Sequence, residues 1–339
     1  MSESRAVILG CAGKSISSDE KSFYRDERPW GFILFARNIG EPNEIADLVA
    51  SLRDSVGRPG APVFIDQEGG RVQRLRPPVA PNYPAGSALG ALYRDDRQAG
   101  LRAAWLMARL HAFDLLRFGI NVDCLPVLDV PIEGASDVIG SRAYGKDPES
   151  VAAMGRAAAE GLMAGGVLPV MKHVPGHGRA FADSHHELPR VDVPIEELRR
   201  HDFAPFKALN DLPMAMTAHV VYTAVDPAAP ATTSPKVIRE IVRGEIGYDG
   251  LLISDDTSMK ALSGDFPDKA AAILAAGVDI VLHCNGVMEE MRGIVSKTVP
   301  LAGRSLERAE RALDFITRRD AVAEADIRQE FAGYFETVA

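Results

Sequence analysis

Short, almost wholly apolar runs recur along the chain, separated by longer segments of mixed polarity. Eight such runs occur, at residues 6–10, 31–36, 62–66, 122–130, 168–173, 215–219, 250–255 and 278–284. A strand in a parallel sheet is covered on both faces, and therefore reads as a continuous apolar run rather than as an alternating one. The pattern predicts eight parallel strands.

The segments between the runs carry the spacing of amphipathic helices. In residues 42–56, apolar side chains recur along one helix face at Ile45, Leu48, Val49, Leu52 and Val56. Further helices are predicted at residues 99–118, 150–164, 195–209, 234–245 and 269–276. Strands that alternate with helices imply parallel βαβ units, and eight of them favour a closed (β/α)8 barrel of the TIM type, with residues 1–339 as a single domain. A doubly wound open sheet is the alternative.

Composition and charge narrow the function classes. Hydrophobic residues make up 46% of the chain and charged residues 25%, which is typical of a globular protein. The formal net charge of −9 argues against a nucleic acid or an anionic membrane as partner. The longest uncharged stretch, residues 77–93, contains four prolines and cannot form a membrane helix. The N-terminus lacks a signal-peptide pattern and the three cysteines form no CxxC pair, so we expect buried free thiols in a cytoplasmic protein.

Charged and polar side chains stand at the ends of five predicted strands. They are Asp66, Asp129, Lys172 with His173, His219, and Asp255 with Asp256. In a barrel, the carboxyl ends of the strands meet at one mouth, where such enzymes place their chemistry. Each residue alone could instead be a helix cap or an ion pair. Their repetition over five strands predicts an active site at the mouth.

The loop KHVPGHGRAFADSHHELP, residues 172–189, contains His173, His177, His185 and His186 among the eight histidines of the chain. Three interpretations stay open. The histidines, with Glu187, could bind a metal ion, although an HExxH motif is absent. Asp183, two residues before His185, could orient that imidazole for proton transfer. The loop could also be a solvated polar segment.

Four motifs in this chain resemble those of glycoside hydrolase family 3, in order and in spacing. They are IDQEGGRVQRL (65–75), KHVPGHG (172–178), ADSH (182–185) and ISDDTSM (253–259). The segments GFILFARN, PVLDV, GSRAYG and AHVVYTAVD agree as well, so the resemblance covers nearly the whole chain. Within that family, the chain looks like the single-domain bacterial β-N-acetylhexosaminidases (NagZ type). Val174 and Thr257 replace the usual Phe and Leu, and neither position carries a catalytic group.

The resemblance implies a role for individual residues. Asp255 would be the nucleophile, His185 the general acid/base, and Asp183 its partner. The implied sugar-binding residues are Asp66, Arg74, Arg142, Lys172 and His173. Side chains alternate along a strand, so only one of Asp255 and Asp256 can face the mouth, and the family pattern selects Asp255. No metal or other cofactor is implied, and we expect a monomer whose partner is a saccharide substrate.

The implied activity is a retaining β-N-acetylglucosaminidase that acts through a covalent glycosyl–Asp255 intermediate. It would release terminal β-linked N-acetylglucosamine from 1,6-anhydromuramoyl muropeptides during peptidoglycan recycling in the cytoplasm. Retaining glycosidases need a carboxylate nucleophile and a proton donor, and a histidine has its ordinary pKa near neutrality. The alternatives are a metal-dependent hydrolase that uses the histidine-rich loop and an inactive sugar-binding barrel.

Overall fold

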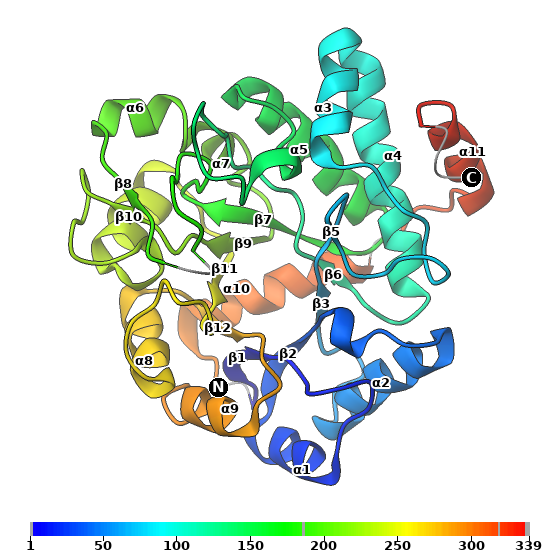
Figure 1. The fold of residues 1–339 in the computed structure, drawn as a ribbon. Coiled ribbons are helices and arrows are strands. Elements are labelled where there is room, and N and C mark those ends of the chain that lie inside the picture. Colours follow the sequence, from blue (N-terminus) through cyan, green and yellow to red (C-terminus); the bar gives the residue numbers. More distant parts are fainter. Residues whose placement is uncertain (1–2, 185–186, 318, 336–339) are drawn as a thin grey trace.

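Parallel strands close into a barrel in the computed structural model, which describes residues 3–184, 187–317 and 319–335 (Figure 1). Eight strands of this described part form the barrel: β1 (Arg5–Leu9), β2 (Pro29–Leu34), β3 (Val63–Ile65), β6 (Val122–Asp123), β7 (Leu168–Val174), β9 (Met214–Thr217), β11 (Leu251–Asp256) and β12 (Ile280–His283). Neighbours around the barrel are neighbours along the chain, and β12 closes the ring by pairing in parallel with β1. The predicted closed barrel is confirmed, and the open-sheet alternative is wrong.

Helices surround the barrel on its outside (Figure 1). The α-helices are α1 (Ser18–Glu27), α2 (Pro42–Ser55), α3 (Gly86–Asp95), α4 (Arg97–Leu116), α5 (Pro148–Ala164), α6 (Ile195–Arg200), α7 (Ala204–Ala208), α8 (Phe266–Ala276), α9 (Met288–Val295), α10 (Gly303–Leu313) and α11 (Glu324–Ala332). Short 3-10 helices are η1 (Ala36–Asn38), η2 (Gly140–Arg142), η3 (Ala231–Thr233) and η5 (Asp314–Thr317), and η4 (Val237–Glu245) is a π-helix. None of the described helices is long and apolar enough to span a membrane.

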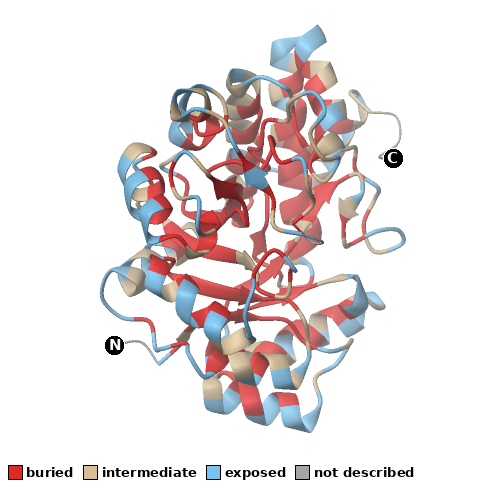
Figure 2. Ribbon diagram, turned by 60° about the vertical axis from the view of Figure 1, so that its left-hand side comes forward, coloured by how far each residue is buried: buried red, intermediate tan, exposed pale blue. Residues whose placement is uncertain are grey.

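Alternation along the strands separates the barrel interior from the layer beneath the helices. In β11, Leu251 and Ile253 pack in the interior, whereas Leu252 packs in the outer layer with helix residues such as Ile273. Figure 2 shows that the barrel strands are mostly buried and that the exposed residues lie on the outer faces of the helices and in the connecting segments. The next inward position of β11, after Leu251 and Ile253, belongs to Asp255. The pleat therefore directs this carboxylate to the carboxyl mouth.

Three predicted elements have different bounds in the structure. The run at 122–130 forms a strand only over β6, because Pro126 has no N–H to donate; Val127 then makes an isolated bridge to Lys172. The segment predicted as one helix at 195–209 forms two short helices, α6 and α7, with Pro205 in the first turn of α7. The segment at 234–245 forms the π-helix η4 rather than an α-helix.

Several connecting segments contain elements that the apolar pattern did not predict. The long loop at 67–96 includes helix α3 and a small antiparallel hairpin of β4 (Gln67–Gly69) and β5 (Val72–Gln73). A second small pair joins β8 (Arg190–Val191) to β10 (Val221–Tyr222). Helices α1, α9, α10 and α11 were also unpredicted. The prediction of buried free thiols is confirmed for Cys11, Cys124 and Cys284.

Candidate active site

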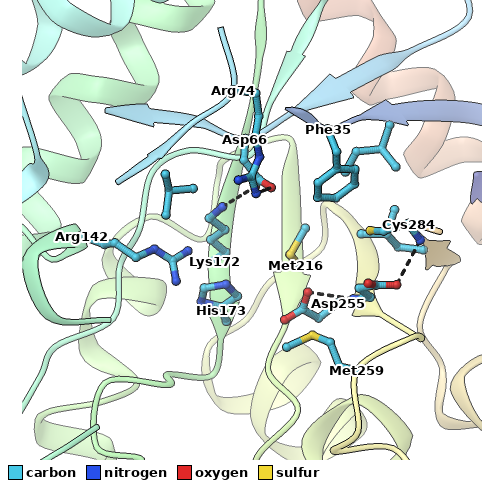
Figure 3. A pocket seen from close by; sticks show the side chains of 14 residues that line it. Phe35, Asp66, Arg74, Arg142, Lys172, His173, Met216, Asp255, Met259 and Cys284 are labelled. Carbon is cyan, nitrogen blue, oxygen red and sulfur yellow. Dashed lines mark hydrogen bonds and ion pairs between the residues drawn. The ribbon is translucent and has the colours of Figure 1, made fainter. Parts of the chain in front are cut away.

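A pocket of about 280 Å³ opens at the carboxyl mouth of the barrel (Figure 3). Its polar wall contains Asp66, Arg74, Arg142, Lys172, His173, Asp255 and Asp256, and its apolar wall includes Phe35, Met216 and Met259. Figure 3 shows Asp66, Arg74 and Lys172 on one side and Asp255 on the other, with Met216 between them. The structure thus brings all five predicted sugar-binding residues and the predicted nucleophile to one pocket.

Asp66 is the centre of the polar wall. It directly follows β3, and its Oδ1 accepts a hydrogen bond from Lys172 Nζ at 2.9 Å while its Oδ2 accepts one from Arg74 Nη2 at 2.8 Å. Burial alone would raise the pKa of Asp66, but Lys172 and Arg74 outweigh burial and hold the pKa well below its usual range. Burial likewise opposes the charge of Lys172, but Asp66 and Glu68 raise the pKa of its ammonium. Asp66 and Lys172 are therefore both ionised.

Glu68 is a site residue that the sequence analysis missed. Its Oε1 lies 2.6 Å from Lys172 Nζ and 2.7 Å from Arg142 Nη2, and its Oε2 accepts from Arg142 Nε at 2.8 Å. The two-point contact fixes the plane of the Arg142 guanidinium, although Arg142 comes from the distant helix η2. Burial alone would raise the pKa of Glu68, but Arg142 and Lys172 outweigh burial and hold the pKa below its usual value. The signal available in the sequence was the position of Glu68 inside IDQEGGR, two residues beyond the strand end.

Asp129 supports the histidines of the following strand. It is fully buried; its Oδ2 lies 2.7 Å from His173 Nδ1, and its Oδ1 accepts from the backbone N–H of His177 at 2.6 Å. Burial raises the pKa of Asp129, but His173 and His177 bring it down to about 2. Burial lowers the pKa of His177 to about 4, so this imidazole is neutral at pH 7. Asp129 fixes the ring of His173 with its Nε2 edge directed away from the carboxylate.

The adjacent residues Asp255 and Asp256 have different surroundings. Asp255 Oδ1 accepts from the backbone N–H of Asp256 at 2.8 Å, and the side chain lines the pocket. Asp256 Oδ1 accepts from the backbone N–H groups of Ser258 and Cys284, each at 3.0 Å, and its Oδ2 accepts from the Ser258 hydroxyl. Burial raises the pKa of Asp255, but His219 and His173 lower it below its usual value. Both residues line the pocket, contrary to the expectation that only one of them faces the mouth. Asp255 is an ionised carboxylate there, whereas Asp256 also ties the residue after β12 to the loop after β11.

Residues 177–184 of the loop after β7 are anchored by side-chain contacts. Arg179 Nε lies 3.0 Å from Asp202 Oδ2, Arg179 Nη1 lies 2.7 Å from Glu197 Oε1, and His177 Nε2 lies 3.2 Å from Ser184 Oγ. Asp183 is half-buried in this loop. His185 and His186 lie outside the described residues, so the predicted pair of Asp183 with His185 stays a prediction.

The metal interpretation of this loop depends partly on the same two histidines. Within residues 3–184, 187–317 and 319–335, no group of three or more His, Cys, Asp or Glu side chains is arranged to hold a metal ion. Glu187, the acidic residue named for that cluster, is exposed. The chemistry that the described residues offer is hydrogen bonding by fixed charged groups and attack by a half-buried carboxylate.

A closed parallel barrel with an ionised carboxylate and a hydrogen-bonding wall at its carboxyl mouth has the construction of a (β/α)8-barrel enzyme. The model of the glycosyl hydrolase family 3 N terminal domain matches residues 8–314. Named β-hexosaminidases are similar to the chain: that of Alkalilimnicola ehrlichii is 41% identical over 82% of this chain and 80% of its own length. That of Bordetella pertussis is 38% identical over 91% of this chain and 87% of its own.

Solved structures agree with these matches. NagZ from Neisseria gonorrhoeae in complex with N-trifluoroacetyl-D-glucosamine superposes with a TM-score of 0.87 at 29% identity, covering 99% of this chain and 98% of that one. A family 3 β-N-acetylglucosaminidase from Paenibacillus has a TM-score of 0.81 at 33% identity; the match covers 96% of this chain but 61% of that longer enzyme. The chain belongs to glycoside hydrolase family 3, and it is a glycoside hydrolase.

Proposed function

We propose that the protein is a retaining β-N-acetylglucosaminidase that removes a terminal β-linked N-acetylglucosamine. The observation that carries the proposal is the placement of ionised Asp255 across a small pocket from the network of Asp66, Lys172 and Arg74 (Figure 3). The pocket volume of about 280 Å³ suits one sugar ring rather than a chain of rings. The named β-hexosaminidases and the sugar analogue bound by the gonococcal NagZ support the same substrate class.

The polar wall would recognise the sugar. Asp66 can accept hydrogen bonds from sugar hydroxyls, while Arg74, Arg142, Lys172 and His173 can donate to hydroxyl or carbonyl oxygens. Each of these groups is already held by a neighbour, so binding needs little reorganisation of the protein. Hydrogen bonds to sugar hydroxyls strengthen as the ring approaches an oxocarbenium-like transition state. The wall would therefore contribute to catalysis as well as to binding.

The proposed reaction has two steps. In the first, an Asp255 carboxylate oxygen forms a bond to the anomeric carbon, the glycosidic C–O bond breaks, and protonated His185 gives its proton to the leaving oxygen. In the second, neutral His185 removes a proton from water, the water oxygen bonds to the anomeric carbon, and the ester bond to Asp255 breaks. Asp183 would orient His185 in both steps. The net reaction adds one water and retains the anomeric configuration.

The biological substrate follows from the resemblance to NagZ-type enzymes. We propose 1,6-anhydromuramoyl muropeptides as the substrate, peptidoglycan recycling as the process, and the cytoplasm as the location. Residues 1–339 would form one catalytic domain that acts as a monomer without a cofactor.

The test compares aryl β-N-acetylglucosaminide with the matching aryl β-glucoside. A site that hydrogen-bonds the acetamido group should reject the substrate without it, so we expect kcat/KM to differ by about 100-fold or more. Asp255→Asn, purified in parallel, controls for a contaminating glycosidase. Equal rates for the two glycosides, or a faster rate for the glucoside, would contradict the proposed specificity.

A further inference from the structure

His219 is a buried histidine at the mouth to which the sequence motifs assign no role. It follows β9, the strand that pairs with β11, and its side chain is fully buried. Its Nε2 lies 3.0 Å from the backbone carbonyl oxygen of Asp256, and its Nδ1 lies 2.8 Å from Thr232 Oγ1. Thr232 is itself buried and lies 2.8 Å from the hydroxyl of Thr217. The imidazole is thus fixed at both nitrogens.

The hydrogen-bond partner of His219 Nε2 shows that this nitrogen carries a hydrogen. A carbonyl oxygen can only accept, so Nε2 carries a hydrogen and donates it to Asp256. The single hydrogen of Thr232 Oγ1 can go to Nδ1, to the Thr217 hydroxyl or to the Ala218 carbonyl at 3.0 Å. When it goes to Nδ1, that nitrogen is an acceptor and the ring is neutral. Burial lowers the pKa of His219 more than the nearby Asp255 raises it, which favours the neutral ring. In either form, Nε2 donates to Asp256.

The Asp256 backbone connects His219 to the proposed nucleophile. The N–H of Asp256 donates to Asp255 Oδ1 at 2.8 Å, while its carbonyl accepts from His219. Its side chain accepts from the backbone N–H of Cys284, the residue directly after β12, which is the other strand that pairs with β11. Residue 256 is therefore held at its carbonyl and at its side chain, and its N–H has a fixed direction. That N–H engages one oxygen of Asp255 and so sets the plane of the carboxylate.

We propose that His219 is a positioning residue, oriented by Thr232, which holds the Asp255 carboxylate in the plane required for attack by fixing the backbone of Asp256. The inference rests on the proposed function, because it assumes that Asp255 is the nucleophile. It assigns His219 no contact with the sugar and no part in proton transfer to the leaving group. A residue that acts only on the nucleophile slows the attack step by a similar factor for every substrate, whatever its leaving group.

The experiment compares His219→Ala with the unmodified protein on two aryl β-N-acetylglucosaminides, one with a good and one with a poor leaving group. We expect kcat/KM, which reports the attack by Asp255, to fall by the same roughly 10- to 100-fold for both. For the poor leaving group, whose first step limits the rate, the loss should appear in kcat with KM within about twofold, because a misdirected nucleophile affects the transition state more than binding. His219→Gln, whose amide can donate to the Asp256 carbonyl, should recover part of the rate.

The pH profile gives a second readout. The charged or titratable side chains that affect Asp255 include His219, His173 and Lys172, and the Asp256 N–H adds a hydrogen bond. Removing His219 frees the Asp256 backbone and weakens its N–H hydrogen bond to the Asp255 carboxylate, so the acid limb of kcat/KM should move to higher pH by a modest amount. A purely structural defect would lower the amount of active enzyme without moving this limb.

His283→Ala is the matched control. His283 is equally buried at the end of β12, but its Nδ1 lies 2.9 Å from Thr257 Oγ1 rather than against the Asp256 carbonyl. We expect it to lower Tm as His219→Ala does, with kcat within about threefold of the unmodified protein. If His219→Ala does not fold, Thr232→Val, which keeps the shape and removes the hydroxyl, should show a smaller loss that is again equal for both leaving groups.

Three results would overturn the inference while leaving the proposed function intact: a loss confined to the poor leaving group, a rise in KM alone, or an unchanged kcat in both His219→Ala and Thr232→Val. Failure of the unmodified protein to hydrolyse either β-N-acetylglucosaminide would overturn the proposed function and this inference together.

Discussion

Charged side chains form networks at both ends of the barrel, and the two networks differ in what their carboxylates bind. At the amino end, Asp279 directly precedes β12, and each of its oxygens has two donors. Oδ2 accepts from the Leu252 backbone N–H and from Arg243, and Oδ1 accepts from Ser305 and Arg308. These donors belong to β11, to η4 and to α10. The carboxylate therefore joins neighbouring elements of the fold.

At the carboxyl end, the donors to Asp66 are themselves pocket residues. Lys172 and Arg74 both bind Asp66, and all three side chains line the pocket. The comparison teaches that a carboxylate whose donors belong to packed elements away from a cavity is part of the scaffold, whereas one whose donors line a cavity is available to a ligand.

The largest expected effect is at Asp255. Asp255→Asn keeps the volume and removes the attacking charge, so kcat should fall by roughly 10⁴-fold or more while Tm stays near that of the unmodified protein. Asp256→Asn weakens the scaffold contacts to Ser258 and Cys284, so it should lower Tm and affect kcat less. If Asp255→Asn kept a tenth of the activity and Asp256→Asn were inactive, the nucleophile would be Asp256.

The next effect is at His185 and depends on the substrate. His185→Ala should slow hydrolysis of a disaccharide by about 10²- to 10⁴-fold, but a dinitrophenyl glycoside much less, because that leaving group hardly needs a proton. With the activated substrate the second step becomes limiting, and stopped-flow absorbance should show a burst of phenolate. Asp183→Ala should behave similarly but more mildly, and His186→Ala is the control. Equal losses for both substrates would mean that His185 positions the sugar.

Glu68 allows a test of the mouth network without touching the nucleophile. Glu68→Gln keeps the shape but removes the charge that fixes Lys172 and Arg142, so kcat/KM should fall on the order of 100-fold. The loss should be equal for activated and natural leaving groups, as measured with the same two substrates. An unchanged kcat/KM would show that Asp66 alone suffices to hold Lys172.

The sequence predicted the barrel because its signal is local. A strand that is buried on both faces is apolar along its whole length, so each of the eight strands can be recognised from its own residues. The alternation of side chains along a strand then places Asp66, Lys172 and Asp255 inward at the mouth. The hypothesis of an active site there followed from residues at strand ends. Glu68 lies beyond a strand end, in a hairpin, and its partner Arg142 is 74 residues away. Nothing in local periodicity reports such a pairing.

The predicted secondary structure was wrong where contacts distant in sequence, rather than the local pattern, decide the conformation. Residues 195–209 have a helical composition, but the helix stops and a second helix, α7, begins with Pro205 in its first turn. The path of the chain through the fold, rather than helix propensity, decides where the first helix stops. The role inferred for His219 depends on a backbone carbonyl and on Thr232, neither of which a side-chain motif records. Sequence patterns identify the groups that touch the substrate more readily than the groups that hold them.

A substitution in the network at the amino end should lower stability and leave activity unchanged, the opposite of a substitution at the mouth. Asp279→Ala leaves Arg243 and Arg308 without their shared carboxylate and the Leu252 N–H without an acceptor, which should cost about 3 kcal/mol of unfolding free energy. Calorimetry should show a Tm lower by several degrees. At temperatures below the transition, kcat and KM should equal those of the unmodified protein. A selective loss of kcat would mean that the two ends are coupled.

The smallest expected effect is that of removing metal ions. The proposed mechanism moves its protons through His185 and forms its covalent bond at Asp255, so dialysis against EDTA should leave kcat and KM unchanged within about 20%. EDTA already saturated with Zn²⁺ serves as the control, because it has the same ionic composition but no chelating capacity. The comparison of the two ends sharpens this test: a metal held by the mouth carboxylates would have to compete with Lys172, Arg74 and Arg142, which already bind Asp66 and Glu68. Activity that EDTA abolishes and Zn²⁺ restores would contradict the two-step mechanism. It would instead favour the metal-dependent hydrolase, with ligands drawn from the loop that contains His185 and His186.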